Sequence, residues 1–257
     1  MAETQDKVII LTGASRGIGQ AIAHFLLSSP ENHKLVVAAR THAALDQLHY
    51  QYPDRVEVLA GDLSSSKIAA TAVELALSRW GRLDGLIVNH GTLEPVKKVA
   101  DASVEEWRRG FDVNVFSAIA LIQASLPHLR KTHGRILLTS SGAAVSAYQA
   151  WGPYGASKAV LNHLAQTLAV EEPDVTTIAI RPGVVDTEMQ REIREVHGES
   201  MSEKDRKKFM GLKEEGGLLK PEGPGHIIAK LSVGAGAWLS GKFLSWNDEA
   251  LKEFQEQ

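Results

Sequence analysis

Short runs of apolar, mostly β-branched residues alternate along this chain with longer stretches in which apolar residues recur at helical spacing. Such runs are typical of parallel strands buried on both faces, and they lie at residues 7–12, 35–39, 55–60, 83–88, 135–139, 176–180 and 241–245. Helical patterns begin after residue 19 and recur at 43–50, 67–80, 104–129, 154–168 and 221–233. This alternation predicts an α/β fold: one domain over residues 1–257 with a doubly wound parallel sheet and helices on both of its faces.

Residues 188–219 differ from the rest of the chain. They are rich in charge, and their apolar residues, including Met189, Ile193, Val196 and Phe209, stand at helical spacing. An amphipathic insertion of this kind is either a mobile lid over a ligand site or two plain surface helices. We favour the lid.

Composition narrows the class of protein. With 44% hydrophobic and 23% charged residues the chain is ordinary for a globular protein, and its net charge of −3 provides no overall field for nucleic acid or an anionic membrane. There are no cysteines, which excludes disulfides and thiolate metal sites. The ten histidines form no metal-binding motif, so no metal is expected.

The first residues are polar and acidic, unlike a signal peptide, and no uninterrupted apolar run approaches the roughly 20 residues that span a bilayer. We therefore expect a cytoplasmic protein that binds neither nucleic acid nor membrane.

A glycine-rich segment follows the first predicted strand and opens a helix. It reads Gly13-Ala14-Ser15-Arg16-Gly17-Ile18-Gly19. Glycines allow a tight turn and a close approach of the backbone, and the free N–H groups of the helix start suit a pyrophosphate. The spacing G-x-x-x-G-x-G differs from the commoner G-x-G-x-x-G, but its position between a strand and a helix still predicts a dinucleotide site.

The second strand ends at Arg40, where a site that prefers NAD usually has an acidic residue that binds the ribose hydroxyls. An arginine suits a 2′-phosphate instead, and Arg16 in the glycine turn adds a second cation. The sequence therefore favours NADP(H) over NAD(H). Asp62 follows the third strand, where it either accepts a hydrogen bond from the adenine amino group or caps a helix.

Two further features suggest acid–base chemistry. Tyr154 and Lys158 stand four residues apart on a predicted helix, so the ammonium lies near the phenol and is expected to lower its pKa from about 10. Such a tyrosine is a plausible general acid for reducing a carbonyl. Asn114 lies in an otherwise apolar stretch, where it either caps a local kink or holds a water molecule at the site.

Together these motifs resemble the short-chain dehydrogenase/reductase family. The similarity extends over about residues 7–190 and rests on Thr12 to Gly19, Asp62, Asn89-x-Gly91, Asn114, Ser141, Tyr154-x-x-x-Lys158 and Pro182-Gly183-x-Val185-x-Thr187. It implies a Rossmann-type sheet of about seven strands, and assembly as a homodimer or homotetramer through the helices that hold Asn114 and Tyr154.

The resemblance also implies a role for each catalytic residue. Tyr154 would donate the proton to the carbonyl oxygen, Lys158 would lower the pKa of the phenol and bind the nicotinamide ribose, Ser141 would polarise the carbonyl, and Asn114 would hold a water linked to Lys158. The implied NADP(H) contacts are Gly13, Ser15, Arg16, Gly17, Ile18, Gly19, Arg40, Asp62, Asn89, Gly91, Tyr154, Lys158, Val185 and Thr187. His90 departs from the family, which usually has alanine there, and this puts the local fit near the adenosine in doubt.

Within the family the chain is most similar to benzil reductases and the related sepiapterin reductases, on segments that include Thr92 to Val96, Ser140 to Ala143 and Pro182 to Gln190. This implies reduction of a small hydrophobic ketone or 1,2-diketone by NADPH. A pterin reductase is an alternative, disfavoured by Ser245 at the position of the pterin-binding aspartate. An NADP(H)-sensing protein without catalysis is another, disfavoured because the catalytic residues are all retained. The expected apolar substrate pocket consists of Leu93, Tyr148, Trp151, Val184, Met189 and Trp246.

Overall fold

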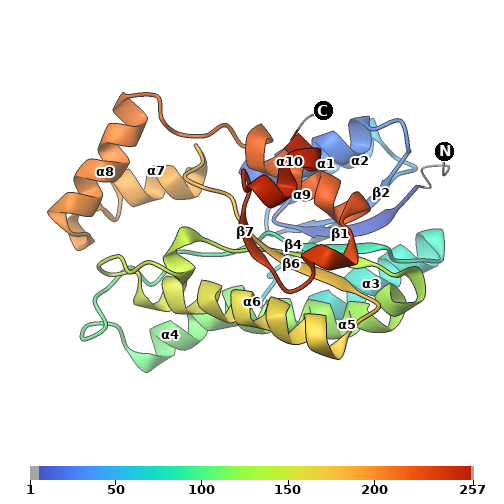
Figure 1. Ribbon diagram of the computed structural model, residues 1–257, viewed down its shortest axis with the longest axis horizontal. Coiled ribbons are helices and arrows are strands. Elements are labelled where there is room, and N and C mark those ends of the chain that lie inside the picture. Colours follow the sequence, from blue (N-terminus) through green and yellow to red (C-terminus); the bar gives the residue numbers. More distant parts are fainter. Residues whose placement is uncertain (1–5, 256–257) are drawn as a thin grey trace.

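A seven-stranded parallel sheet forms the centre of the protein (Figure 1). The computed structural model describes residues 6–255. The strands lie in the order β3-β2-β1-β4-β5-β6-β7, with bounds β1 Val8–Thr12, β2 Lys34–Ala39, β3 Val56–Ala60, β4 Gly85–Val88, β5 Arg135–Thr139, β6 Thr176–Arg181 and β7 Phe243–Ser245. The strand order reverses direction next to β1, because β2 lies on one side of it and β4 on the other. A crevice for a ligand is expected at such a point, outside the carboxyl ends of the strands.

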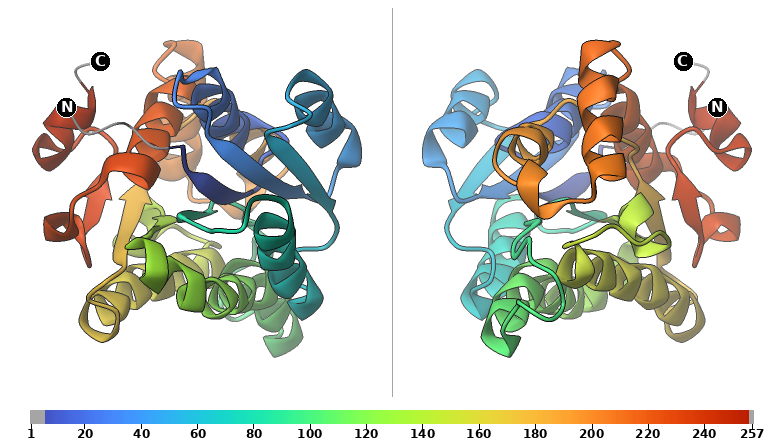
Figure 2. Two further views of the ribbon diagram at one scale, coloured as in Figure 1. Left: turned by 90° about the vertical axis from the view of Figure 1, so that its right-hand side faces the viewer. Right: turned by 90° about the vertical axis from the view of Figure 1, so that its left-hand side faces the viewer.

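Alternate residues of β1 face two separate cores, which explains why the run is apolar throughout. Ile9 and Leu11 pack with α1 (Gly17–Ser28), α2 (His42–Gln51) and α9 (Glu222–Gly234). Val8 and Ile10 pack with α3 (Ser66–Trp80), α5 (Ser117–Thr132) and α6 (Gly152–Glu171). Figure 2 shows the sheet between these two helical layers. The predicted fold and its strands are confirmed, with ends that differ by at most two residues.

The stretch predicted as one helix over 104–129 is broken in the middle. It consists of α4 (Val104–Phe111), a π-helical turn η1 (Asp112–Phe116) and α5. In the π-helical turn the N–H of Ser117 reaches back five residues to the carbonyl of Asp112. Periodicity did not reveal the break, because the turn is only five residues long and lies within a mostly apolar stretch.

By length and mean hydropathy, residues 104–132 would also suffice to cross a membrane. Their apolar residues are nevertheless used by the protein core: Leu121, Ile122 and Leu129 of α5 are buried against the sheet. This is the pattern of an internal helix of a globular domain.

The charge-rich insertion forms α7 (Glu188–Glu195), the 3₁₀ turn η3 (Gly198–Ser200) and α8 (Glu203–Glu214), which project from one end of the sheet in Figure 1. Its two ends are joined at the base, where Val185 and Leu219 form a parallel bridge. We call residues 188–219 the lid. The remaining segments are η2 (Gly142–Ala144), η4 (Ala237–Leu239), η5 (Glu249–Leu251) and α10 (Lys252–Gln255).

Candidate active site

A single cavity of about 1310 Å³ runs along the carboxyl ends of the strands and under the lid. Nearly all of the predicted site residues line it: Gly13, Ser15, Arg16, Gly17, Ile18, Arg40, Asp62, Asn89, Gly91, Ser141, Tyr154, Lys158, Val185 and Thr187. Gly19 and Asn114 lie behind this lining layer, buried. The fold therefore brings residues that are far apart in the sequence to one crevice.

The glycine-rich turn has the shape that its sequence predicts. Gly13 and Gly17 adopt positive φ angles of 68° and 54°, a conformation that side chains disfavour. A Cβ atom on Gly19 would lie 2.0 Å from the carbonyl oxygen of Gly13, and one on Gly17 would lie 3.0 Å from the methyl group of Thr187. The turn thus packs tightly against α1 on one side and leaves its backbone open to the cavity on the other, which suits a pyrophosphate at the start of a helix.

Charged residues gather at the end of the cavity near β2 and β3. Arg40 and Arg16 are exposed and line it, and Asp62 lies close enough to Arg40 to feel its charge. The Asp62 carboxylate accepts hydrogen bonds from the N–H and the hydroxyl of Ser64, at 3.0 and 2.8 Å, and these bonds lower its pKa. Because the N-cap of α3 is Ser65, Asp62 is not the helix cap that one of our two interpretations required.

Tyr154 lies on the first turns of α6, with only 8% of its surface exposed. Burial raises the pKa of its phenol, and a hydrogen bond with Ser141 opposes that rise. The expected lowering of this pKa by Lys158 is not seen, because the Lys158 ammonium is 5.8 Å from the centre of the ring and is directed elsewhere. Ser141, rather than Ser140, faces Tyr154: the Ser140 hydroxyl donates to Asn162 Oδ1 at 2.6 Å.

The Lys158 ammonium donates a 2.7 Å hydrogen bond to the carbonyl of Thr139 at the end of β5. Burial lowers the pKa of Lys158 to about 8. The Thr139 hydroxyl donates to Asn89 Oδ1 at 3.3 Å, and the Asn89 amide donates to the Gly13 carbonyl at 3.3 Å. A continuous set of hydrogen bonds therefore connects the lysine to the glycine-rich turn.

Asn114 lies in the π-helical turn, but its side chain does not cap that turn, as one of our two interpretations required. Its Oδ1 accepts from the Thr92 N–H at 2.8 Å, and its amide donates to the Thr92 carbonyl at 2.8 Å and to the Ser157 hydroxyl at 3.0 Å. A Cβ on Gly91 would lie 3.2 Å from Asn114 Oδ1 and 3.4 Å from Lys158 Nζ. Asn114 and Lys158 thus approach one another across a glycine, and the water expected between them stays a prediction.

Comparison with known proteins identifies this arrangement. Residues 7–198 match the family model described as short chain dehydrogenase. The chain belongs to the short-chain dehydrogenase family. It is therefore an oxidoreductase of a family whose enzymes use NAD(P), and the predicted family and fold are confirmed.

Two relatives in Saccharomyces cerevisiae cover almost the whole chain. An uncharacterised oxidoreductase, YIR035C, is 42% identical over 96% of this chain and 98% of its own length. The benzil reductase ((S)-benzoin forming) IRC24 is 38% identical over 97% of this chain and 99% of its own length. The crystal structure of YIR035C superposes with a TM-score of 0.95 and covers 97% of this short-chain dehydrogenase and 99% of the other chain.

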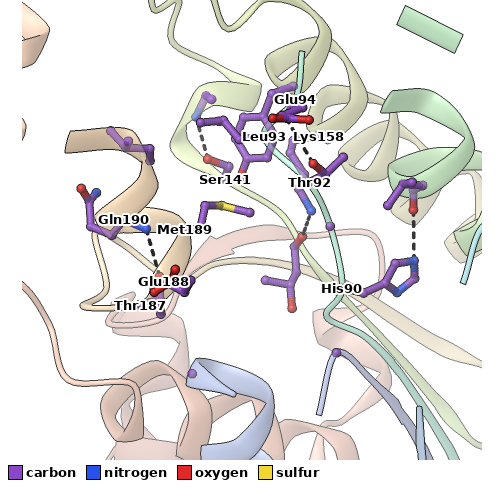
Figure 3. A pocket seen from close by; sticks show the side chains of 18 of the residues that line it. His90, Thr92, Leu93, Glu94, Ser141, Lys158, Thr187, Glu188, Met189 and Gln190 are labelled. Carbon is purple, nitrogen blue, oxygen red and sulfur yellow. Dashed lines mark hydrogen bonds between the residues drawn. The ribbon is translucent and has the colours of Figure 1, made fainter. Parts of the chain in front are cut away.

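The lid covers the far end of the cavity with apolar side chains. Of the expected substrate pocket, Leu93, Tyr148, Trp151, Val184 and Met189 line the cavity of this short-chain dehydrogenase. Trp246 is not part of the lining that the structure describes: its ring packs against Gly183 and Gly223 instead. Figure 3 shows Leu93 and Met189 near Ser141 and Lys158. This end of the cavity thus combines an apolar and aromatic wall with polar side chains, among them Glu94, Glu188 and Gln190.

Sequence reasoning did not assign the lid residues Ile193 and Phe209 to this pocket. Both line the cavity, and the ring of Phe209 stacks on Trp151 with centroids 5.5 Å apart. The Lys208 ammonium donates to the Tyr148 hydroxyl at 3.2 Å. The helical spacing of apolar residues in the lid was the available signal, but it did not say which partner they would cover.

Proposed function

We propose that this chain is an NADPH-dependent carbonyl reductase that acts on a small hydrophobic ketone or 1,2-diketone. The observation that carries the proposal is the hydrogen-bonded pair of hydroxyls, Tyr154 and Ser141, at a cavity whose outer wall is apolar and aromatic. Two such hydroxyls can bind one carbonyl oxygen, and the apolar wall suits the substituents of that carbonyl.

The residues along the rest of the cavity fit a nicotinamide dinucleotide. The glycine-rich turn would hold the pyrophosphate, and the backbone at Val185 together with Thr187 would hold the carboxamide. Arg40 and Arg16, both exposed at the cavity, support a 2′-phosphate and hence NADP(H). When bound, this cofactor supplies the hydride.

The chain itself positions the carbonyl and provides the proton. Ser141 donates a hydrogen bond to the carbonyl oxygen and stabilises the negative charge that develops there. Tyr154 stays protonated at neutral pH because burial raises its pKa, so it is a proton donor in the direction of reduction. The Lys158 ammonium, whose pKa burial lowers to about 8, is held by the Thr139 carbonyl at the end of β5, where it would bind the nicotinamide ribose.

The aromatic wall supports a substrate with an aryl substituent. Trp151 meets the ring of Tyr154 edge-on at 5.9 Å and stacks on Phe209, so an aryl group beside the reacting carbonyl would lie against aromatic faces. The similarity to a benzil reductase agrees with this reading. We also expect the enzyme to be cytoplasmic. We expect it to form a homodimer or homotetramer through the helical segment that holds Asn114 and through α6, which holds Tyr154.

The test is consumption of NADPH, followed by its absorbance, with a panel of carbonyl compounds that includes benzil, aliphatic 1,2-diketones and sepiapterin. We expect turnover of benzil and little of sepiapterin. The matched variant is Tyr154→Phe, which keeps the ring and removes the proton; it should abolish turnover while NADPH binding persists.

Retained reduction in Tyr154→Phe would overturn the mechanism. Preferential turnover of sepiapterin would favour a pterin reductase, and NADPH binding without turnover of any compound would favour a sensing protein.

A further inference from the structure

His90 lies between two cofactor-facing residues, Asn89 and Gly91, yet its own side chain is turned away from the reacting groups. The imidazole is buried, with 8% of the residue exposed. In Figure 3 the ring points away from Ser141, toward the helical segment that carries the π-helical turn. The mechanism proposed above gives this histidine no task.

Both ring nitrogens of His90 are engaged by different elements. Nδ1 lies 2.7 Å from the hydroxyl of Thr12, the last residue of β1. Nε2 lies 3.1 Å from the carbonyl oxygen of Val113 and 2.7 Å from the hydroxyl of Ser117. Since a carbonyl only accepts, we assign the hydrogen to Nε2. Nδ1 then accepts from the Thr12 hydroxyl, whose hydrogen it shares with the Ile87 carbonyl at 3.2 Å. The histidine thus links the end of β1 to the π-helical turn.

The π-helical turn creates the need for such a link. The N–H of Ser117, which would donate to the Val113 carbonyl in a regular α-helix, donates to Asp112 instead. The Val113 carbonyl accepts from His90 Nε2 and from the Ser117 hydroxyl, at 3.1 and 2.6 Å. These bonds satisfy a partly buried carbonyl that the irregular turn would otherwise leave short of a donor.

Asn114, the next residue, depends on the geometry of this turn. Its amide binds the backbone of Thr92 in both directions and the hydroxyl of Ser157, the residue immediately before Lys158. Residues 90–92 therefore hold the π-helical turn at two points, through the ring of His90 and the backbone of Thr92. A shift of the turn would move Asn114 relative to Lys158.

We infer that His90 is a positioning residue that fixes the π-helical turn, and through it Asn114 and Lys158, for proton transfer. The neutral ring that this role requires agrees with a pKa held at about 4 by burial and by the nearby Lys158 ammonium. The inference rests on the proposed reductase function, because it concerns the proton that this reaction consumes.

The test compares His90→Ala with His33→Ala in the full-length protein. His33 is equally buried, 4% exposed, but accepts from the Lys7 N–H beside the start of β1, at the end of the sheet opposite the cavity.

Both variants should be less stable than the wild-type protein. Only His90→Ala should lower kcat, by roughly ten- to a hundredfold with little change in KM, and shift the alkaline limb of the pH profile upward as water reaches Lys158. His90→Gln, whose amide can donate to Val113, should restore most of the rate.

Hydrogen exchange of residues 112–117 gives a readout that does not need turnover. Exchange there should increase in His90→Ala and not in His33→Ala. If His90→Ala does not fold, Ser117→Ala, which removes only the hydroxyl at the Val113 carbonyl, should change the rate and the exchange in the same direction by less.

The inference would be overturned if His90→Ala kept the wild-type pH profile and a kcat within about twofold of wild type. Equal losses of kcat in His33→Ala would overturn it as well. Absence of carbonyl turnover by the wild-type protein would overturn the proposed function instead. Unchanged exchange in His90→Ala would overturn the inference in either case.

Discussion

The indole of Trp151 and the phenyl ring of Phe209 stack with centroids 5.5 Å apart and planes inclined by 17°. Trp151 stands three residues before Tyr154, and Phe209 belongs to the lid. This contact attaches the lid to the segment that carries Tyr154. It also buries the Trp151 indole N–H, for which residues 6–255 offer no acceptor. Helices α7 and α8 therefore contribute to the wall of the cavity, and their role as a substrate lid stays a prediction.

Removal of the Phe209 ring should weaken binding of aryl substrates. In Phe209→Ala we expect KM for benzil to rise about fivefold or more, because the substrate loses an aromatic contact worth about 1 kcal/mol and a closed wall. KM for a small aliphatic diketone should change less. The control is Met210→Ala on the same helix, 39% exposed. Equal effects of the two variants would contradict a role of the stack in binding.

Exchange of the charge at Arg40 should change the cofactor preference. In Arg40→Asp the 2′-phosphate loses a charge-assisted partner worth about 1.5–3 kcal/mol, so KM for NADPH should rise roughly ten- to a hundredfold while KM for NADH falls. Steady-state kinetics with both cofactors measure this. Lys131→Asp, an exposed position at the end of α5, gives the same change in net charge. A preference that stays the same in Arg40→Asp would refute the 2′-phosphate site.

The pKa of Lys158 should be visible in the pH dependence of reduction. Burial lowers it to about 8, so the ammonium is present below that pH and is lost above it. Since the pKa of Tyr154 is raised above 10, its protonated form persists further, and the first alkaline limb should belong to Lys158. We expect kcat/KM of the free enzyme to be level below about pH 8 and to fall above it. A profile without a limb near that pH would contradict this assignment.

Local spacing was enough to predict which residues meet at the candidate site, but not the contacts that surround them. Tyr154, Lys158 and the glycine-rich turn have fixed distances along one helix or one turn, so the sequence alone places them. Spacing also put Lys158 near the phenol, yet the sign of the pKa shift at Tyr154 depends on burial by segments distant in the sequence. Phe209 was not assigned to the pocket for the same reason, because its ring meets Trp151, which is distant in the sequence.

Two further features depend on tertiary structure. The direction of the His90 ring is set by the π-helical turn, which apolar periodicity does not distinguish from a continuous helix. Trp246 was expected in the apolar substrate pocket, but its ring packs against Gly183 and Gly223, which have no side chains to keep it away.

Burial of neutral His90 should make the protein less stable in acid. The pKa of this histidine is about 4 in the folded protein and about 6.5 when unfolded, so between these values the unfolded chain binds the extra proton. The contribution of the neutral ring to the free energy of unfolding is fully present above about pH 6.5. It is lost as pH falls toward 4, a difference of about 3 kcal/mol. Urea unfolding at several pH values in this window measures it. In His90→Gln the pH dependence should be weaker by this amount, whereas the parts due to His33 and His226, whose pKa values are also lowered, should remain. An identical pH dependence in His90→Gln and the wild-type protein would show that the ring is not held neutral by the fold.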